Sequence, residues 1–417
     1  MDKFIIKGNK KLDGKITISG SKNAILTLLP ASLLIDGKVI FKNVPQIKDV
    51  ETMMKILKHL GAEVYFENSE LIINTKNVYY QDLLIDEIKL LRASILFLGP
   101  ILAKFGKIKI YFPGGDVIGT RSIEPHIKGM IDLGAKIECF KDILVGQFRK
   151  FNNYNILLKE ISVTASENLI MASCLSKKPI NLRLIALEPH VQVLCKFLSL
   201  AGYHIEGIGT HFLKIYKGSQ IKKEIIFEVP SDYIEAGTYF ALSPLIKNKI
   251  IIQKAPLDHL DSVFVVAKEM NIYFEIKNKD IILKSSKLKG TKIQTGLYPK
   301  FPTDLHPPFG VLATQAKGVT LIHEWMYENR FGYLKEVQYM GADIEILDPH
   351  RAIIIGPTKL IGKEVKSLDI RAGISLVIAG LFAKGETIIY EVEKIDRGYE
   401  KIEEKLNELG AEIKRVS

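Results

Sequence analysis

Cysteine is scarce in this chain of 417 residues, which has only three copies. Cys139, Cys174 and Cys195 are odd in number, stand far apart and have apolar neighbours. Disulfides and thiolate metal sites need paired or closely spaced cysteines, so the sequence argues against both. We expect three free thiols, all buried, because an unpaired cysteine usually packs as a small apolar side chain.

Long apolar runs are missing as well. The most apolar stretch, 95–105, is interrupted by Gly99-Pro100 and by Lys104. It is far short of the roughly 20 apolar residues that a membrane span needs. The first residues lack the apolar core of a secretory signal. These absences predict a cytoplasmic protein without a membrane segment.

Basic residues are in excess, but they do not cluster. The net charge is +11, and no block of five or more Lys or Arg occurs. A positive field raises the local concentration of negatively charged ligands. Nucleic-acid binding needs a clustered basic footprint, which this sequence does not have. We therefore expect an anionic partner that is not nucleic acid.

What the chain does contain is an internal repeat. An amphipathic stretch, then Leu-Gly-Ala or a variant, then an alternating apolar run recur at 60–64, 133–137, 201–205, 340–344 and 409–413. The glycine spacings are 73, 68, 139 and 69, and a degenerate copy at 270–274 fills the doubled step. The pattern predicts six units of about 70 residues, with glycine at the positive-φ position that ends a helix.

A second marker keeps the same period. A turn followed by a β-branched strand occurs at 37–41, 106–110, 178–182, 248–252, 318–322 and 385–389. Each unit therefore reads as helix, strand, helix and two strands, which predicts an α/β fold (α+β in some classification schemes). A solenoid is the simpler alternative, but solenoid repeats usually run 20 to 50 residues.

Six units of this size would group as three and three in two lobes. We place the boundary near 229–232, between the third and fourth units. The N-terminal strand precedes the first unit and is expected to complete the last one. The predicted domains are thus an N-terminal lobe, 21–229, which carries the loop 111–122, and a C-terminal lobe that combines 1–20 with 230–417.

Two segments outside the repeats carry unusual chemistry. Residues 19–24, Ser-Gly-Ser-Lys-Asn-Ala, precede an apolar helix, so backbone N–H groups and the Lys22 ammonium would converge on a phosphate or carboxylate. A simple helix cap is the alternative. The loop 111–122 combines three glycines, Asp116 and Arg121, which is typical of a mobile lid or of a long hairpin connection.

Further acids and arginines stand out towards the C-terminus. Asp304 lies between prolines in 302–308, where it could act as a base or form a turn, and 327–330 reads Tyr-Glu-Asn-Arg. Arg92, Arg371 and Arg397 adjoin apolar positions. Arginine at such positions favours bidentate binding of carboxylate or phosphate. Ordinary surface ion pairs are the alternative for each of them.

Together these segments resemble the UDP-N-acetylglucosamine 1-carboxyvinyltransferase family of enolpyruvyl transferases. The matching motifs are 18–24, 92–94, 113–115, 301–304, 328–330, 369–372 and 395–400. The resemblance runs from about residue 3 to the C-terminus. It implies an inside-out α/β barrel, with two lobes each of three βαβαββ repeats, in agreement with the six units found above.

The resemblance also implies a reaction. The enolpyruvyl group of phosphoenolpyruvate would pass to the 3′-hydroxyl of UDP-N-acetylglucosamine by addition and elimination, with release of phosphate. This is the first committed step of peptidoglycan synthesis. The implied partners are these two small molecules, and no cofactor or metal is expected.

The resemblance assigns roles position by position. Phosphoenolpyruvate would be held by Lys22, Asn23, Arg121 and Arg397. Asp304 would lie beside the attacking hydroxyl, and Asp116 with Lys22 and Arg397 would complete the catalytic set. The implied contacts to UDP-N-acetylglucosamine are Arg92, Arg121, Ser122, Ile123, Glu124, Pro125, Ile161, Ser162, Val163, Thr164, Asp304, Met326, Arg330 and Arg371.

This chain departs from the family pattern at three positions. Most members carry cysteine in the lid where this chain has Asp116. Glu124 stands where aspartate is commoner. Glu160 replaces a lysine found in some members near the diphosphate, although Lys159 is adjacent. Because fosfomycin inactivates the family by alkylating the lid cysteine, we expect this protein to be intrinsically resistant.

Two rival functions remain to be weighed. The shikimate-pathway enolpyruvyl transferase shares the fold and the donor, but would be expected to show Gly-Ser-Lys-Ser and Asn-Ala-Gly-Thr, whereas residues 20–23 read Gly-Ser-Lys-Asn. A non-catalytic paralogue that only binds the nucleotide sugar would not need the cations for phosphoenolpyruvate.

Overall fold

The computed structural model describes residues 2–116 and 118–416. Residue 117 of the predicted lid, and residues 1 and 417 at the ends of the predicted C-terminal lobe, lie outside the described residues. The described chain forms two compact units. The N-terminal unit comprises Gly20–Asp116 and Arg121–Pro230. The C-terminal unit comprises the described residues before Gly20, residues 118–120 and the described residues after Pro230.

The N-terminal unit alternates helices and short strands. Its helices are α1 (Lys22–Ala31), η1 (Ser32–Leu34), α2 (Lys48–His59), α3 (Asp86–Leu90), η2 (Arg92–Phe97), α4 (Leu98–Phe105), α5 (Glu124–Leu133), α6 (Val163–Ser173) and α7 (Pro189–Ala201). Its strands are β3 (Lys38–Lys42), β4 (Glu63–Glu67), β5 (Glu70–Asn74), β6 (Lys107–Tyr111), β7 (Ala135–Phe140), β8 (Ile143–Phe148), β9 (Asn155–Leu157), β10 (Ile180–Arg183), β11 (His204–Glu206), β12 (Phe212–Tyr216) and β13 (Glu224–Glu228). The described strands form sheets in the orders β13-β3-β5-β4, β6-β8-β7 and β11-β12-β10-β9.

The C-terminal unit repeats this alternation. Its helices are α8 (Tyr233–Thr238), η3 (Tyr239–Leu245), η4 (Leu257–His259), α9 (Asp261–Glu269), α10 (His306–Ala313), α11 (Gly332–Tyr339), α12 (Ile370–Phe382), η5 (Val392–Arg397) and α13 (Ile402–Glu408). Its strands are β1 (Lys3–Lys7), β2 (Leu12–Thr17), β14 (Ile246–Gln253), β15 (Phe274–Lys277), β16 (Asp280–Leu283), β17 (Lys292–Gln294), β18 (Gly318–His323), β19 (Asp343–Asp348), β20 (Arg351–Gly356), β21 (Glu364–Lys366), β22 (Glu386–Tyr390) and β23 (Ile413–Val416). The described strands form sheets in the orders β15-β16-β14-β2, β17-β18-β20-β19 and β21-β22-β1-β23.

The repeat markers coincide with this architecture. The turn-and-strand markers contain or overlap β3, β6, β10, β14, β18 and β22, and each of these strands lies in a different sheet. The predicted helix-ending glycines all have positive φ, at Gly61, Gly134, Gly202, Gly341 and Gly410. In the degenerate copy Asn271 takes the same left-handed conformation, with φ 61°. Asparagine tolerates this conformation better than most residues, which explains how the pattern survives there without glycine.

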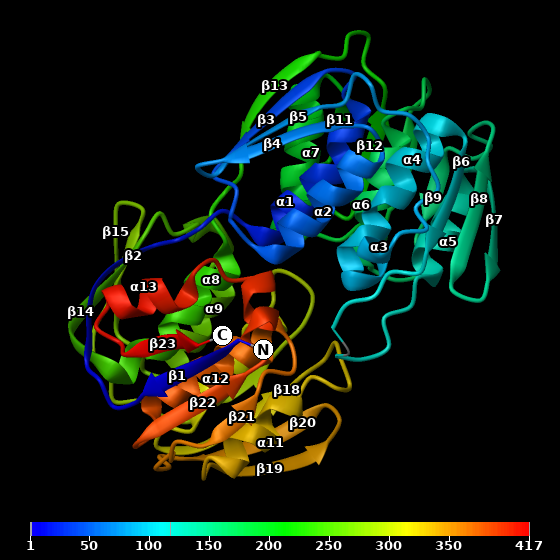
Figure 1. Cartoon of the computed structure of the whole chain (residues 1–417). Helices are drawn as coiled ribbons and strands as arrows, with labels where there is room; N and C mark the ends of the chain where they lie inside the picture. Colours follow the sequence, from blue (N-terminus) through cyan, green and yellow to red (C-terminus); the bar gives the residue numbers. More distant parts are fainter. Residues whose placement is uncertain (1, 117, 417) are drawn as a thin grey trace. The chain divides into compact units, whose positions relative to one another are not determined.

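Both units are built around buried helices. In α6 the residues from Ala165 to Ser173 are all buried, and α12 is buried along its whole length. A helix that is buried on every side belongs to the core rather than to the surface. Figure 1 shows α1, α6 and α7 inside the N-terminal unit with its sheets towards the outside. None of the helices within the described residues is long and apolar enough to cross a bilayer.

The N-terminal segment contributes to two sheets of the C-terminal unit. β1 pairs antiparallel with both β22 and β23, which belong to the last repeat, as the sequence predicts. β2 pairs in parallel with β14 of the fourth repeat, a contact that the sequence pattern does not indicate.

One sequence expectation about the thiols is wrong. Cys174 and Cys195 are buried, but Cys139 is exposed. It lies on β7, an edge strand whose second half is mostly exposed, so it has no core to pack against. All three cysteines are free, as predicted.

Candidate active site and nucleotide-sugar pocket

The segment around Lys22 forms a positively charged helix start. Lys22 is the first residue of α1, and its ammonium lies 3.5 Å from Asp49 Oδ2, with 12% of the lysine side chain and 6% of the aspartate side chain exposed. Asn23 follows it in the first turn. A Cβ on Gly20 would lie 1.7 Å from the Asn43 carbonyl oxygen, so only glycine permits this close approach. The N-terminal end of α1 and Lys22 together favour an anion here.

Two arginines donate hydrogen bonds to backbone carbonyls of the predicted lid. Arg121 donates a hydrogen bond from Nη2 to the Asp116 carbonyl oxygen at 2.6 Å. Arg92, the first residue of η2, donates from Nη2 to the Ser122 carbonyl oxygen at 2.9 Å. Gly115 has φ 106°, and a Cβ there would meet the Arg92 backbone nitrogen at 2.9 Å. The structure therefore brings Asp116, Arg121, Arg92 and Ser122 together.

Arg121 has no ion-pair partner among the described residues. Within residues 2–116 and 118–416, no Asp or Glu oxygen lies within ion-pair distance of its guanidinium. Its side chain is half-buried rather than fully solvated. A guanidinium has five N–H donors, and here one of them holds the lid carbonyl. The remaining donors suit an anionic ligand.

Residues 118–120 of the predicted lid belong to the C-terminal unit. The Thr120 N–H donates to Glu328 Oε1 at 2.7 Å, and the Asn329 N–H donates to the Ile118 carbonyl at 3.1 Å. Gly119 has φ 151°, and a Cβ there would lie 2.6 Å from Glu328 Oε2. Hydrogen bonds from its own backbone N–H and from Thr120 lower the pKa of Glu328. Glu328 of the predicted Glu-Asn-Arg motif thus anchors this loop.

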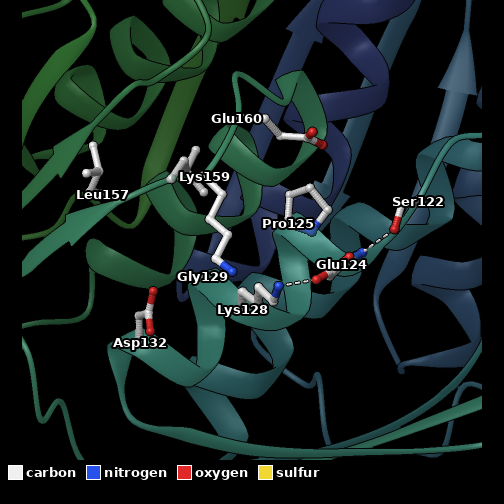
Figure 2. Close-up of a pocket in the computed structure, with 10 residues that line it drawn as sticks. Ser122, Glu124, Pro125, Lys128, Gly129, Asp132, Leu157, Lys159 and Glu160 are labelled. Carbon is white, nitrogen blue, oxygen red and sulfur yellow. Dashed lines mark hydrogen bonds and ion pairs between the residues drawn. The ribbon is translucent and has the colours of Figure 1, made fainter.

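A pocket of about 150 Å³ lies beside the start of α5 in the N-terminal unit (Figure 2). Glu124 begins this helix, and its backbone N–H donates to Ser122 Oγ at 3.0 Å. The lining residues are Ser122, Glu124, Pro125, Lys128, Gly129, Asp132, Leu157, Leu158, Lys159 and Glu160. Ser122, Glu124 and Pro125 were predicted as nucleotide-sugar contacts, and the other lining residues were not. Ile123, the N-cap residue of α5, stands between Ser122 and Glu124 in the chain.

Charges of both signs meet in this pocket. Lys128 forms an ion pair with Glu124, as Figure 2 shows, and that contact raises the pKa of Lys128. The neighbouring Lys128 lowers the pKa of Lys159, because two ammonium groups repel. Position 160, where some family members have lysine, presents Glu160 to the same pocket. A diphosphate bound here would have to meet Lys128 and Lys159 rather than residue 160.

The other predicted nucleotide-sugar contacts of this unit lie at the start of α6. Ile161 precedes the N-cap residue Ser162, and Val163 and Thr164 form the first turn. The Ser162 side chain makes no capping hydrogen bond, while its carbonyl accepts from the Ser166 N–H at 2.9 Å. All four residues, 161–164, are half-buried.

In the C-terminal unit Asp304 is held by two buried arginines. Arg330 Nη2 donates to Oδ1 at 2.8 Å, and Arg371 donates to Oδ2 from Nε at 3.0 Å and from Nη2 at 2.9 Å. The arginine side chains are 3% and 5% exposed, whereas that of Asp304 is 27% exposed. Burial alone would lower the pKa of Arg371, but Tyr399 and Asp304 raise it above its ordinary value. The three predicted residues thus form one fixed cluster around an accessible carboxylate.

Arg397 and Met326 take their positions from neighbouring contacts. Arg397 ends η5 and is half-buried; the preceding Asp396 receives hydrogen bonds at 2.7 and 3.0 Å from Arg415 of β23. Met326 donates its backbone N–H to Glu324 Oε1 at 2.8 Å. Both residues are therefore fixed through the backbone by ionic groups next to them in the chain.

Glu324 is a site residue that sequence reasoning missed. Its fully buried carboxylate accepts hydrogen bonds from the hydroxyls of Thr295 and Thr303 at 3.0 and 2.9 Å. It also accepts from the backbone N–H groups of Met326 and Tyr327 at 2.8 and 3.1 Å. It ties the turn that bears Asp304 to the loop that bears Met326. An acid directly after a β-branched strand is the one signal in the sequence that could have indicated it.

The chain is similar to known proteins in both sequence and fold. Residues 6–406 match the family described as EPSP synthase (3-phosphoshikimate 1-carboxyvinyltransferase). The fold resembles that of the enolpyruvyl transferase NikO from Streptomyces tendae, with a TM-score of 0.90 at 19% identity, over 100% of this chain and 99% of that one. EPSP synthase from Acinetobacter baumannii gives a TM-score of 0.75 at 18% identity, over 100% of both chains. The mixed α/β fold is therefore that of enolpyruvyl transferases.

Relatives found by sequence have a much higher identity to this chain than the two solved structures do. The chain is 40% identical to the UDP-N-acetylglucosamine 1-carboxyvinyltransferase of Campylobacter fetus subsp. fetus, over 100% of both proteins. It is 38% identical to the protein of the same name from Borreliella burgdorferi, over 100% of this chain and 99% of that protein. With end-to-end similarity at this level, the chain belongs to the UDP-N-acetylglucosamine 1-carboxyvinyltransferase family of enolpyruvyl transferases.

Proposed function

We propose that this protein transfers the enolpyruvyl group of phosphoenolpyruvate to the 3′-hydroxyl of UDP-N-acetylglucosamine and releases phosphate. The observation that carries the proposal is the 40% identity over the full length of a relative bearing that name. The shikimate-pathway alternative has weaker support, because the matched EPSP synthase structure is 18% identical. The product would enter peptidoglycan synthesis, and the proposed location is the cytoplasm, where both phosphorylated substrates are expected.

The proposed reaction has an addition step and an elimination step. The sugar hydroxyl adds to C2 of phosphoenolpyruvate while C3 gains a proton, and phosphate then leaves as C3 loses a proton. Phosphoenolpyruvate is a compact polyanion, so fixed cations must hold it and stabilise the charge that moves. We assign this role to Lys22, Arg121 and Arg397, with Asn23 as a further contact. Two observations support the assignment: the Arg121 guanidinium makes no ion pair among the described residues and keeps donors beyond the one that holds the Asp116 carbonyl, and Lys22 stands at a helix start.

We assign Asp304 to the attacking hydroxyl and Asp116 to proton transfer at C3. Both oxygens of Asp304 are bonded to the buried Arg330 and Arg371, so this carboxylate has a defined position from which to orient a hydroxyl. Met326, Arg92 and the residues 122–125 and 161–164 are proposed contacts of the nucleotide sugar. The pocket at the start of α5 supports this for residues 122, 124 and 125.

We also propose the finer architecture that the resemblance implies. Each unit would be an inside-out α/β barrel of three βαβαββ repeats, with 1–20 completing a lobe formed by 230–417, and 21–229 forming the other. The buried helices α6 and α12 and the placing of the six strand markers in separate sheets support this arrangement.

A phosphate-release assay tests the proposed function. The enzyme should release phosphate when UDP-N-acetylglucosamine and phosphoenolpyruvate are both present, and not when shikimate 3-phosphate replaces the sugar. Release with shikimate 3-phosphate alone would favour the rival enzyme. Binding of the nucleotide sugar without phosphate release in any mixture would favour a non-catalytic paralogue.

A further inference from the structure

A buried histidine connects the helix that lines the pocket to the first turn of α6. His126 of α5 is fully buried. Its Nε2 lies 3.0 Å from Thr164 Oγ1, and its Nδ1 lies 2.9 Å from Asn168 Nδ2. A buried imidazole with a partner on each nitrogen must have one nitrogen as donor and the other as acceptor when it is neutral. Which nitrogen carries the proton decides what Thr164 can do.

The orientation of Asn168 settles this question. Its Oδ1 accepts a hydrogen bond from the Gly99 backbone N–H at 2.6 Å, and its Nδ2 donates to the Ile95 carbonyl at 2.9 Å. If the amide were flipped, two acceptors would face each other at Ile95 and two donors at Gly99. Both contacts are buried, where unsatisfied groups are costly. Asn168 Nδ2 must therefore also be the donor to His126.

The imidazole of His126 is consequently neutral, with its proton on Nε2. Its Nδ1 accepts from Asn168, so Nε2–H donates to Thr164 Oγ1. Burial, with a smaller contribution from the nearby Arg92, lowers the pKa of His126 to about 3. The ring therefore keeps this form over the whole range in which an enzyme would work.

The hydroxyl of Thr164 is thereby directed. It receives the proton of His126, so its own proton has to point to a different acceptor. Across the residues that the structure describes, no protein group accepts a hydrogen bond from this hydroxyl. Thr164 is half-buried and lies in the first turn of α6, four residues after Glu160 of the pocket wall.

We propose that Thr164 donates its hydroxyl proton to an acceptor oxygen of the bound nucleotide sugar, and that His126, fixed as the Nε2–H tautomer by Asn168, is the positioning residue that directs it. This inference rests on the proposed function, which supplies the identity of the ligand. Gly99 and Ile95 fix Asn168, Asn168 fixes His126, and His126 donates to Thr164. The direction of the Thr164 hydroxyl proton is therefore set before the ligand binds.

Steady-state kinetics of four variants test the proposal. Thr164→Val removes the hydroxyl at nearly constant volume and should raise KM for UDP-N-acetylglucosamine about tenfold, which corresponds to about 1.4 kcal/mol and lies within the range of one hydrogen bond. KM for phosphoenolpyruvate should change less than about twofold. Thr164→Ser keeps the hydroxyl and is the matched control. His126→Phe should also raise KM for the sugar. In the double variant, KM for the sugar should exceed that of Thr164→Val by no more than about twofold.

A purely structural role for His126 predicts something different. The effect of His126→Phe on KM for the sugar would then add in full to that of Thr164→Val. An unchanged KM for the sugar in Thr164→Val would show that the hydroxyl does not contact the ligand. Nitrogen-15 spectra of the wild-type ring provide a readout that does not depend on variants. We expect a protonated Nε2, an unprotonated Nδ1 and no titration between pH 5 and 8; a protonated Nδ1 or a titrating ring would overturn the assignment.

The two proposals fail in separate ways. Wild-type phosphate release together with unaltered sugar KM in Thr164→Val would leave the function standing and refute the inference. Absence of phosphate release by the wild type would refute the proposed function. In that case UDP-N-acetylglucosamine binding, measured by calorimetry on the wild type and Thr164→Val, still decides whether the hydroxyl contacts the ligand.

Discussion

At the scale of single residues, Asp116 and the three cysteines determine how this protein reacts with electrophiles. By the family resemblance, Asp116 corresponds to the lid position where most members carry cysteine. The three cysteines of this protein are poor nucleophiles and do not replace that lid cysteine. Partial desolvation raises the pKa of the exposed Cys139. Burial raises the pKa of Cys195 to about 12, with Glu167 adding to the shift, and raises that of Cys174 well above its usual range. Near neutral pH all three are thiols, and the thiolate is the nucleophilic form.

We therefore predict that fosfomycin, an epoxide that alkylates the lid cysteine of relatives, does not inactivate this protein. Asp116→Cys should create time-dependent inactivation, with one adduct on the new cysteine detectable by mass spectrometry. Asp116→Asn, which cannot transfer the proton, should lose turnover and still bind UDP-N-acetylglucosamine. A covalent adduct on any lid residue of the unmodified protein would contradict the prediction, and full turnover by Asp116→Asn would remove Asp116 as proton donor.

At the scale of elements, α6 carries an acid in its buried interior. Glu167 is 1% exposed, and burial raises its pKa to about 8, with the neighbouring Thr27 opposing the shift and Glu188 adding to it. The unfolded chain would ionise this group near 4.5, its ordinary value. Between these values the folded state holds a proton that the unfolded state releases. The contribution of this group to stability is therefore fully present below about pH 4.5 and is lost as the pH rises towards 8.

Glu167→Gln should remove this pH dependence while keeping the size of the side chain. The free energy of unfolding of the variant relative to wild type should grow by about 1.4 kcal/mol per pH unit between about pH 5 and 8, and level off above that. Denaturant unfolding of both proteins from pH 5 to 9 measures the difference. Glu138→Gln, on the exposed side of β7, is the control and should show no such slope. A constant difference for Glu167→Gln would show that the carboxyl is already ionised in the folded protein.

At the scale of the whole molecule, the net charge of +11 is the property that acts furthest from the site. A positive protein attracts phosphoenolpyruvate, a compact polyanion, before any contact forms. Such attraction is screened over about 8 Å at physiological ionic strength and over less at higher salt.

We expect kcat/KM for phosphoenolpyruvate to fall severalfold when potassium chloride is raised from about 0.02 to 0.5 M, with kcat changing less than about twofold. Sucrose at equal osmolality serves as control for effects other than charge. A kcat/KM that is independent of salt would mean that only short-range contacts hold the donor.

The sequence predicted a large part of this fold because the fold repeats. The helix-ending residues Gly61, Gly134 and Asn271 have the positive φ that their pattern requires, and β1 completes the last repeat. The burial of Cys139 was predicted wrongly, because apolar neighbours in the chain do not show which face of an edge strand has a partner. Pairing of β2 with β14 also escaped prediction, since it joins segments with no local signal in common.

The amino-acid sequence by itself determined the repeat, the helix and strand periods, and the residue types that can hold an anion. These are local properties, fixed by backbone sterics and by the alternation of apolar side chains. Tertiary structure alone decided that Arg330 and Arg371 converge on Asp304, that Glu324 joins two loops, and that His126 lies within hydrogen-bond distance of Thr164. Hydrogen bonds and ion pairs depend on distances of about 3 Å between side chains, and only the packing of the buried helices and sheets brings residues remote in the chain that close.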